Sequence, residues 1–322
     1  MRVALDVSPL RLTRAGSARY VAGLRRELPK HVEFRELAWG GSGRATAALR
    51  DVVWYPLGLP RAARGADVLH CPTFRAPLHP RVPMVVTVLD LAVLRHPELF
   101  NRWNRTYSRL TVARVVRAAR RVIAISEFTK GELVELLGVD PDRVAVIGVP
   151  PLGEFSPDGA RAQGEYLLAV GTLEPRKNLE RAAEAAARAG VELRVVGARG
   201  WGAVSPNGVR WLGAVGDDEL ARLLRGARAL VYPSLYEGFG IPILEAMSVG
   251  TPVVTSRGGA TEEVAGGAAV LVDPLDPASI AAGIGEADRR REELRALGLA
   301  RAQTFSWDDV ARRTTEVYGE AL

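Results

Sequence analysis

Two carboxylates around a glycine-containing turn are the residues of this sequence best placed to do chemistry. The segment 232–254, YPSLYEGFGIPILEAMSVGTPVV, holds Glu237 and Glu245 with seven residues between them, and Gly238 and Gly240 lie in the turn. Glycines let backbone amides approach an anion, and the start of a following helix adds a partial positive charge. The segment therefore predicts an anion site, although a plain strand-turn-helix with two surface carboxylates would look similar.

Short apolar runs position this turn, and they recur along the whole chain. In the first half they are Val3–Val7, Val32–Leu37, Val68–Cys71, Met84–Leu89, Val122–Ile125 and Val144–Val149. In the second half they are Tyr166–Val170, Leu193–Val196, Val209–Leu212, Ala229–Tyr232, Pro252–Thr255 and Ala269–Val272. Several are apolar throughout, which is typical of parallel strands covered on both faces. Because stretches of helical length separate them, the sequence predicts an α/β protein with two doubly wound, Rossmann-like domains.

The Pro- and Gly-rich segment 149–164 marks the predicted domain boundary. We expect domains at 1–155 and 156–305, followed by an amphipathic helix over 306–322 that crosses back toward the first domain. Residues 1–155 carry 24 Lys and Arg against 14 Asp and Glu, whereas residues 156–322 carry 19 against 23. Halves of opposite net charge predict different partners.

Composition excludes several classes of protein. The 322 residues are 48% hydrophobic and 25% charged, as in a folded protein rather than a disordered one. The single cysteine, Cys71, cannot close a disulfide within the chain, and four histidines argue against several metal sites. Asp6 interrupts the first apolar residues, unlike a signal peptide, and no uncharged run approaches the ~18–20 apolar residues of a membrane span. We expect a soluble, cytoplasmic protein, with contact at the inner face of the membrane as an option.

The longer string EGFGIPILEAMSVGTPVVTS resembles the signature of the family 4 retaining glycosyltransferases, whose GT-B fold places two such domains across a cleft. The family pattern is E-x7-E around a Gly-rich turn, followed by E-A-M/L-A-x-G-x-P-V-V. It is matched by Glu237, Gly238, Phe239, Gly240, Pro242, Glu245, Ala246, Gly250, Pro252 and Val253. Further stretches are similar in order: ISEFTKGEL (125–133), GTLEPRKNL (171–179), VDP (272–274) and FSWDDVARRTTEVY (305–318). The resemblance covers nearly the entire chain.

The resemblance implies a donor site in the second domain, with the active site in the cleft. It places Arg176 and Lys177 on the donor diphosphate and Glu237 over the transferred sugar, the three residues implied to be catalytic. Cations there stabilise the charge that develops on the leaving nucleoside diphosphate. Glu245 would bind the ribose hydroxyls, and Thr172 stands where many relatives have an arginine. The other residues implied for the donor are Gly238, Phe239, Gly240 and Ile241 in the turn, Leu212 near the base, and Gly16.

In the first domain, Gly16 lies in the loop after the first strand, where the family often has G-x-G-R-Y. Its second glycine is replaced here by Ala18. The loop would lie across the cleft from the diphosphate, although a tight surface turn is an equal reading. Ser126, within ISEFTKGEL, is assigned to the acceptor or sugar side.

A departure from the family occurs after the fourth strand, where a His-Asp pair is common. The sequence has Leu89 and Asp90 there, both assigned to the acceptor or sugar side. Either His96 or His70 takes the role of the missing histidine, or the role is absent. Because a leucine would pack well against a methyl group, we hypothesise a 6-deoxy sugar donor such as rhamnose.

We predict no metal, no other cofactor and no nucleic-acid partner. Asp140-Pro-Asp142 has the D-x-D spacing of metal-dependent glycosyltransferases, but its composition is ordinary turn chemistry. The resemblance implies that cationic side chains and helix dipoles neutralise the diphosphate instead. No helix-turn-helix, zinc or aromatic-platform signature accompanies the basic first domain.

A strongly basic segment lies between Arg95 and Arg121, with eight arginines and one acid, Glu98. Arg102, Arg105 and Arg109 share one face of a predicted helix. Such a face suits an anionic membrane or an acidic acceptor, and it is equally compatible with plain solvation.

These observations predict a retaining glycosyltransferase that moves a hexose or 6-deoxyhexose from a nucleotide-diphosphate sugar to a hydroxyl of a glycan, a lipid-linked glycan or a small molecule. The resemblance implies that the acceptor attacks from the face that the nucleotide leaves. No enzymic nucleophile is then needed, in agreement with the lack of a convincing Ser/His/Asp or Cys/His set. Two alternatives stay open: a UDP-sugar 2-epimerase on the same fold, and a non-catalytic sugar-nucleotide or nucleic-acid binding protein.

Overall fold

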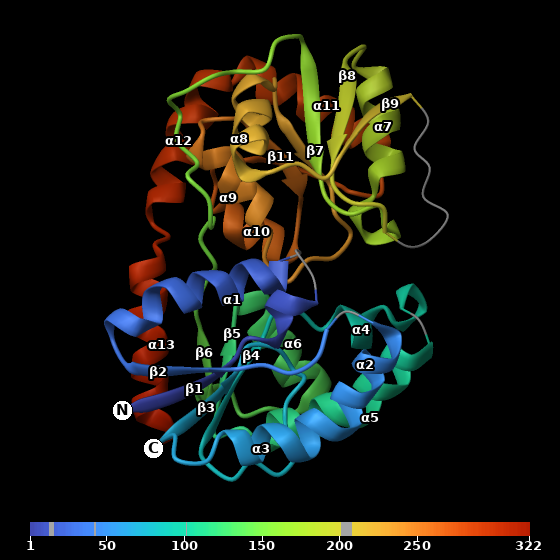
Figure 1. Ribbon diagram of the computed structural model, residues 1–322. Coiled ribbons are helices and arrows are strands. Elements are labelled where there is room, and N and C mark those ends of the chain that lie inside the picture. Colours follow the sequence, from blue (N-terminus) through green and yellow to red (C-terminus); the bar gives the residue numbers. More distant parts are fainter. Residues whose placement is uncertain (13–15, 42, 101, 201–207) are drawn as a thin grey trace. The chain divides into compact units, whose positions relative to one another are not determined.

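A computed structural model describes residues 1–12, 16–41, 43–100, 102–200 and 208–322 (Figure 1). The chain forms two compact units: unit 1 comprises Met1–Leu152 with Ser306–Leu322, and unit 2 comprises Gly153–Phe305. Each unit contains a six-stranded parallel sheet, so the predicted pair of doubly wound α/β domains is confirmed. In the part of the chain described, no helix combines the length and the apolar character needed to cross a membrane.

Unit 1 has the strand order β2-β1-β3-β4-β5-β6, with every neighbouring pair parallel. Its strands are β1 (Arg2–Asp6), β2 (Glu33–Leu37), β3 (Val68–Cys71), β4 (Met84–Val88), β5 (Arg121–Ala124) and β6 (Val144–Val146). Its helices are α1 (Gly16–Glu27), α2 (Arg44–Leu49), η3 (Arg50–Gly58), α3 (Leu59–Ala62), α4 (Ala92–Arg95), α5 (Arg102–Ala118), α6 (Glu127–Leu137) and α13 (Trp307–Ala321). The segment η3 is a π-helix that runs without a break from α2 into α3.

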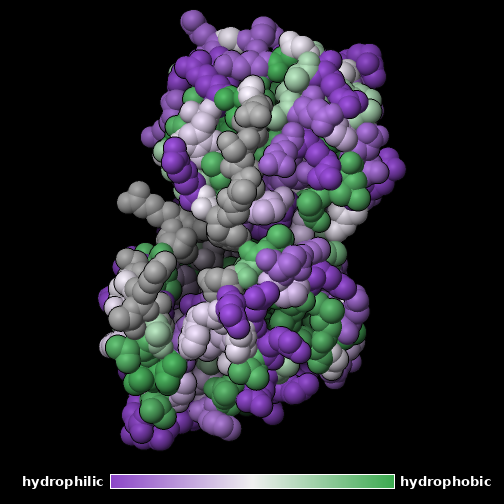
Figure 2. Space-filling model, turned by 90° about the vertical axis from the view of Figure 1, so that its right-hand side faces the viewer, coloured by the Kyte–Doolittle hydropathy of each residue, from purple (hydrophilic) through white to green (hydrophobic). Residues whose placement is uncertain are grey.

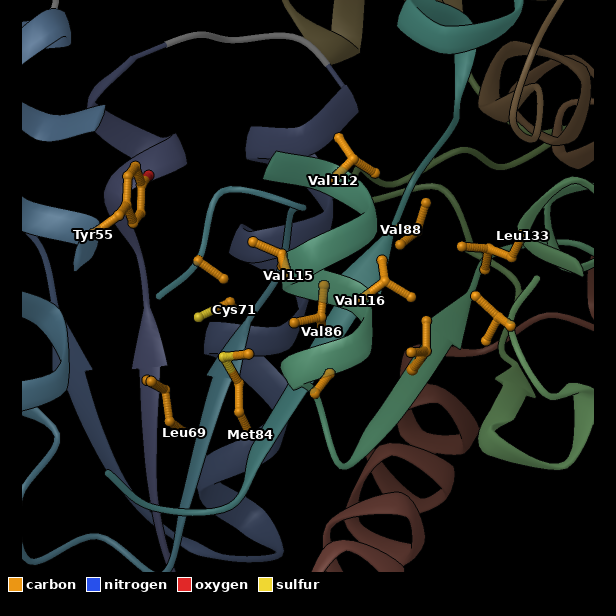
Figure 3. Packing of buried hydrophobic residues seen from close by; sticks show 14 of the residues in the cluster. Tyr55, Leu69, Cys71, Met84, Val86, Val88, Val112, Val115, Val116 and Leu133 are labelled. Atoms are coloured by element: carbon orange, nitrogen blue, oxygen red, sulfur yellow. The ribbon is translucent and has the colours of Figure 1, made fainter. Parts of the chain in front are cut away.

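One face of the unit 1 sheet packs against α5, as Figure 3 shows. Val112, Val115 and Val116 of α5 belong to the same buried cluster as Met84 and Val86 of β4. These valines lie three and four residues apart, which places them on one side of a helix. The alternate residues of the strands therefore point to the opposite face.

The opposite face carries a fully buried chain of polar side chains. The ring of His70 on β3 is hydrogen-bonded through Nδ1 to the hydroxyl of Tyr318 on α13, and through Nε2 to Oγ1 of Thr87 on β4, both at 2.8 Å. Tyr20 of α1 contacts the same Thr87 oxygen at 3.0 Å. Beside this chain α1 and α13 approach closely, because a Cβ at Gly23 would lie 2.2 Å from the ring of Trp307. The predicted C-terminal helix thus packs on the sheet of unit 1 and is hydrogen-bonded to it through Tyr318.

Unit 2 has the strand order β12-β11-β10-β7-β8-β9, again parallel throughout. Its strands are β7 (Tyr166–Val170), β8 (Glu192–Val196), β9 (Val209–Gly213), β10 (Leu230–Tyr232), β11 (Val253–Ser256) and β12 (Val270–Val272). Its helices are α7 (Leu179–Arg188), α8 (Asp217–Gly226), α9 (Ile241–Ser248), α10 (Gly259–Ala265), α11 (Pro277–Arg289) and α12 (Arg291–Gln303).

Helices cover both faces of the unit 2 sheet. Leu167 and Ala169 of β7 share a buried cluster with residues of α7 and α11, which also contact each other. The other face of the sheet packs against α8: the hydroxyl of Tyr166, which alternates with Leu167 on β7, donates a hydrogen bond to the carbonyl oxygen of Leu223 on α8 at 2.6 Å. This covering on both sides explains why strands such as β7 and β12 are apolar without alternation. Ligands of such sheets bind beyond the carboxyl ends of the strands.

Candidate functional site

The carboxyl ends of two neighbouring strands, β7 and β10, carry the candidate catalytic residues in unit 2. A short 3-10 helix, η6 (Pro175–Lys177), follows β7 and supplies Arg176 and Lys177. The loop after β10 supplies Glu237. The two loops are joined directly, since the amide of Leu235 donates a hydrogen bond to the carbonyl oxygen of Arg176 at 2.8 Å. Strand neighbourhood therefore brings together residues about sixty positions apart in the sequence.

Glu237 lies between the two cations. Its Oε1 is 2.5 Å from Nζ of Lys177, and its Oε2 is 2.7 Å from Nη1 of Arg176. The hydroxyl of Tyr232 donates to Oε1 of Glu237 at 2.7 Å and accepts from Nζ of Lys177 at 2.8 Å. The guanidinium of Arg176 also pairs with Glu174 at 2.8 Å. The most exposed of these side chains, Arg176, is only 21% exposed, so two cations and two carboxylates balance each other away from bulk solvent.

The electrostatics of the cluster keep Glu237 ionised. Burial by itself raises the pKa of this carboxyl, but the charges of Lys177 and Arg176 prevail and lower it to about 2. Burial lowers the pKa of Lys177, and Glu237 opposes that change. Burial, with the charge of Glu237, holds the pKa of Tyr232 well above its usual value, so Tyr232 remains a neutral donor.

The predicted anion-binding turn leads straight into α9. Gly240 has a φ of 115°, a conformation that favours glycine, and it is the residue before the helix. No side chain caps the first turn of α9, which begins with Ile241 and contains no acid there. Gly238 lies buried in the turn, and Phe239 packs its ring edge-on against Phe305 at 5.9 Å between centroids.

Glu245, the second carboxylate of the pattern, is buried on α9 with 3% of its surface exposed. It is four positions beyond Ile241, so it lies about one turn after the helix start. Of the remaining donor predictions, Thr172 is half-buried in the loop after β7, and Leu212 is half-buried near the end of β9. The ligand role of each stays a prediction.

Three side chains of this region were not singled out from the sequence. Tyr232 and Glu174 belong to the ion cluster, as described above. Asn178 adopts a left-handed conformation at φ 57°, and its side-chain amide donates to the carbonyl oxygens of Pro233 and Pro274 at 2.9 and 2.6 Å. It thus ties together the loops after three strands. The position of Tyr232 as the last residue of β10 was a signal that could have found it.

In unit 1, Leu89 and Asp90 lie just beyond β4 in the wall of a cavity of about 310 Å³. The lining also includes Pro9, Leu12, Ser17, Tyr55, Thr73, Phe74 and Arg75. Asp90 accepts a hydrogen bond from the amide of Ala92 at 3.1 Å. Gly16 begins α1, next to the lining residue Ser17, and a Cβ there would meet nothing within 4 Å.

Two unit 1 residues considered from the sequence have structural roles. Ser126 is buried and caps α6, because its hydroxyl oxygen accepts from the amide of Thr129 at 3.0 Å. His70 is fully buried with both ring nitrogens hydrogen-bonded, so it is not available to replace the family histidine. His96, the other alternative, directly follows α4 as its C-cap residue and is half-buried.

The D-x-D pair forms a turn. The side chain of Asp140 accepts from the amide of Asp142 at 3.0 Å and caps a short 3-10 helix, as the turn interpretation requires. Among the described residues, no three His, Cys, Asp or Glu side chains gather closely enough to hold a metal ion. Independence from metal stays a prediction.

Comparison with known proteins agrees with this geometry. Residues 14–149 match the family described as Glycosyltransferase Family 4, and residues 164–287 match Glycosyl transferases group 1. O-antigen chain mannosyltransferase B of Escherichia coli is 32% identical over 281 residues, which cover 78% of this chain and 74% of that protein. D-inositol 3-phosphate glycosyltransferase of Acidothermus cellulolyticus is 34% identical over 282 residues, covering 75% of this chain and 62% of that protein.

Solved structures share the fold across the whole chain. Sucrose-phosphate synthase from Thermosynechococcus elongatus superposes with a TM-score of 0.77 at 18% identity and covers 99% of this chain and 98% of its own. Anabaena HepE in complex with UDP and glucose has a TM-score of 0.74 at 19% identity and covers 98% of both chains. Together with the matched families and relatives, these likenesses show that the chain belongs to the family 4 glycosyltransferases and has the GT-B fold.

Proposed function

We propose that this glycosyltransferase is a retaining, metal-independent enzyme that moves a hexose or 6-deoxyhexose from a nucleotide-diphosphate sugar to an acceptor hydroxyl. The observation that carries the proposal is the buried cluster of Arg176, Lys177 and Glu237 beside the start of α9. A guanidinium, an ammonium and a helix N-terminus together suit a diphosphate. HepE, solved with UDP and glucose, and the relatives named as glycosyltransferases support a nucleotide-sugar donor.

In this proposal Glu237 balances the two cations until the donor arrives. The diphosphate then competes for Arg176 and Lys177, which each have further N–H groups to donate. Glu237 is freed to accept hydrogen bonds from hydroxyls of the transferred sugar. As the bond to the anomeric carbon breaks, the two cations stabilise the negative charge on the leaving nucleoside diphosphate. Donors aimed at such a charge contribute ~3–4 kcal/mol in other enzymes.

The acceptor belongs, in the same proposal, to the cavity of unit 1. Its lining combines apolar surface from Leu12 and Phe74 with the carboxylate of Asp90 and the hydroxyl of Ser17. Apolar surface with a few oriented polar groups suits a sugar ring, which has a hydrophobic face and hydroxyls at its edge. A glycan, a lipid-linked glycan or a small molecule would present such a ring.

The test is thermal unfolding of the purified protein with UDP, GDP, dTDP and the corresponding nucleotide sugars. A ligand at ~100 times its dissociation constant adds ~2.7 kcal/mol to the native state. At ~2–4 °C per kcal/mol, the correct nucleotide raises the Tm by several degrees. Lys177→Met removes most of this shift, whereas Lys30→Met, at a lysine that is 61% exposed, leaves it unchanged.

If no nucleotide or nucleotide sugar raises the Tm of a protein shown to be folded, the donor proposal is overturned. Conversion of a UDP-sugar to its 2-epimer without an acceptor would favour the epimerase instead. Once an acceptor is found, nuclear magnetic resonance of the product decides the anomeric configuration. Transfer that requires added metal after treatment with a chelator would contradict metal independence.

A further inference from the structure

A helical surface of unit 1 exposes large apolar side chains to solvent, although the opposite side of the same helical segment already packs Tyr55 and Leu59 into the core. Along the continuous segment α2–η3–α3, the buried side includes Arg50 and Asp51, exposed by 2% and 4%. The exposed side carries Leu49, Val52, Val53 and Leu57, each 45–59% exposed. Exposed apolar groups opposite buried charges are informative, because folding alone does not favour either.

The start of α5 continues this surface. Trp103 is 50% exposed, and its indole Nε1 donates to Oδ2 of Asp51 at 3.2 Å, which fixes α5 beside η3. Among the residues described, seven of the thirteen exposed large hydrophobic residues lie on or beside these two helices, so the apolar exposure is concentrated here. They are Trp39, Leu49, Val52, Val53, Leu57, Trp103 and Leu110; Trp39 stacks on Trp54 of η3. We call this the η3–α5 surface. Figure 2 shows one face of the molecule coloured by hydropathy, on which hydrophobic residues lie beside hydrophilic ones.

The charged residues of the η3–α5 surface are arginines, so its charge is positive. Arg102 and Arg109 of α5 are exposed and Arg105 is half-buried, and within the described chain none of the three has a carboxylate at ion-pair distance. No acid occurs in residues 99–126, and Asp51, which is buried, is the only acid in residues 38–66. Arginines therefore accompany the apolar side chains without local neutralisation.

We propose that the η3–α5 surface binds the face of an anionic lipid bilayer. Aliphatic and indole side chains enter the interface between headgroups and acyl chains, and the arginines attract anionic headgroups. A second copy of this chain is a poorer occupant, because a two-fold symmetric contact would bring the arginines of one surface against those of the other. An oppositely charged membrane satisfies both the apolar and the cationic groups.

Flotation with vesicles tests this proposal without knowledge of any sugar substrate. The wild-type protein binds vesicles that contain phosphatidylcholine and about one third phosphatidylglycerol. Its affinity for vesicles of phosphatidylcholine alone is at least ~10-fold lower. Each arginine charge near the membrane contributes ~5-fold to the affinity. The variant with Arg102→Glu and Arg109→Glu therefore binds the anionic vesicles at least ~25-fold more weakly. Raised salt weakens wild-type binding in the same direction.

The apolar contribution is tested with Val52→Asp combined with Leu57→Asp, which also weakens binding to anionic vesicles at least ~10-fold. Matched controls change equally exposed residues of unit 2: Leu275→Asp with Leu297→Asp, and Arg188→Glu with Arg289→Glu. The controls keep wild-type binding within about 2-fold, and circular dichroism confirms that every variant is folded. If the aspartate variant does not fold, the charge-reversed pair decides the outcome.

Three results would overturn the proposal. One is a wild-type protein that does not float with anionic vesicles, and another is a set of surface variants that bind like the controls. The third is a wild-type dimer that Val52→Asp with Leu57→Asp converts to monomers while no vesicle binding is detected. That result would make the η3–α5 surface an interface between copies of the chain.

Discussion

Replacing Glu237 by glutamine removes the charge that balances Lys177 and Arg176 while keeping the size of the side chain. The pKa of Glu237 lies at about 2 in the folded protein, against a usual value of 4.5. At ~1.36 kcal/mol per pKa unit, this difference corresponds to roughly 3 kcal/mol of stability at neutral pH. Because Glu237 is only 9% exposed, screening by solvent reduces this figure little.

The sign of the pH dependence follows from the depressed pKa. The stabilisation is fully present above the unfolded-state pKa of about 4.5, and it is lost as the pH falls toward 2. Glu237→Gln therefore lowers the free energy of unfolding by roughly 3 kcal/mol at pH 7, and the difference from wild type shrinks through this pH window. Hydrogen exchange of amides in β7 and β10 measures the stability of unit 2 directly.

The matched control is Glu184→Gln on α7, where the ion pair with Arg188 leaves both side chains 51% exposed. Exposed pairs contribute ~0–1 kcal/mol, so this control changes stability little. A difference between Glu237→Gln and wild type that stayed constant from pH 7 to pH 2 would refute the reasoning. It would show that the lost stability came from hydrogen bonding or packing and not from the carboxylate charge.

Three further outcomes are expected. Glu237→Gln binds the nucleoside diphosphate product at least as tightly as wild type by calorimetry, because the cations lose a competitor, while transfer falls ~10²-fold or more. Leu89→His raises the turnover of 6-hydroxy donors relative to 6-deoxy donors, and an unchanged ratio in a coupled assay would end the 6-deoxy hypothesis. Burial lowers the pKa of His70 to about 3. The wild-type protein therefore loses ~1.4 kcal/mol per pH unit as the pH falls below about 6.5, and His70→Gln removes that slope in unfolding experiments at pH 4–7.

The fold could be predicted because several of its strands, such as β7, β10 and β12, are apolar without interruption. A run such as Tyr166–Val170 is recognised without knowledge of its neighbours, because helices cover both faces of the sheet and favour apolar residues at successive positions. Elsewhere the strand limits differ by a few residues, as at β6, which ends at Val146 and not at Val149. Strand ends depend on pairing with neighbours, which a single sequence does not state.

The candidate site could be predicted only as far as its residues lie in one recognisable motif. The turn from Glu237 to Glu245 is local, so its glycines and carboxylates are visible in the sequence. The ion cluster is not local, because it depends on β7 and β10 being neighbours in the sheet. The contacts of Tyr232 and Asn178 therefore emerge from the structure, although the place of Tyr232 at the end of a predicted strand was a signal for the first of them.

The η3–α5 surface shows a different limit of sequence reasoning. Periodicity identifies an apolar side of a helix, and the usual interpretation is that this side is buried. In the α2–η3–α3 segment apolar residues lie on both sides: Tyr55 and Leu59 are buried together with Arg50, whose guanidinium donates to the carbonyl oxygen of Gly41 at 3.2 Å, and Val52 and Leu57 remain outside. Nη1 of Arg50 thus has an acceptor within the protein, although its Nε has no hydrogen-bond partner among the described residues, whereas the apolar side chains of Val52 and Leu57 stay more than half exposed. The exposed apolar side chains, and not the number of arginines, are therefore the stronger reason to expect a lipid surface.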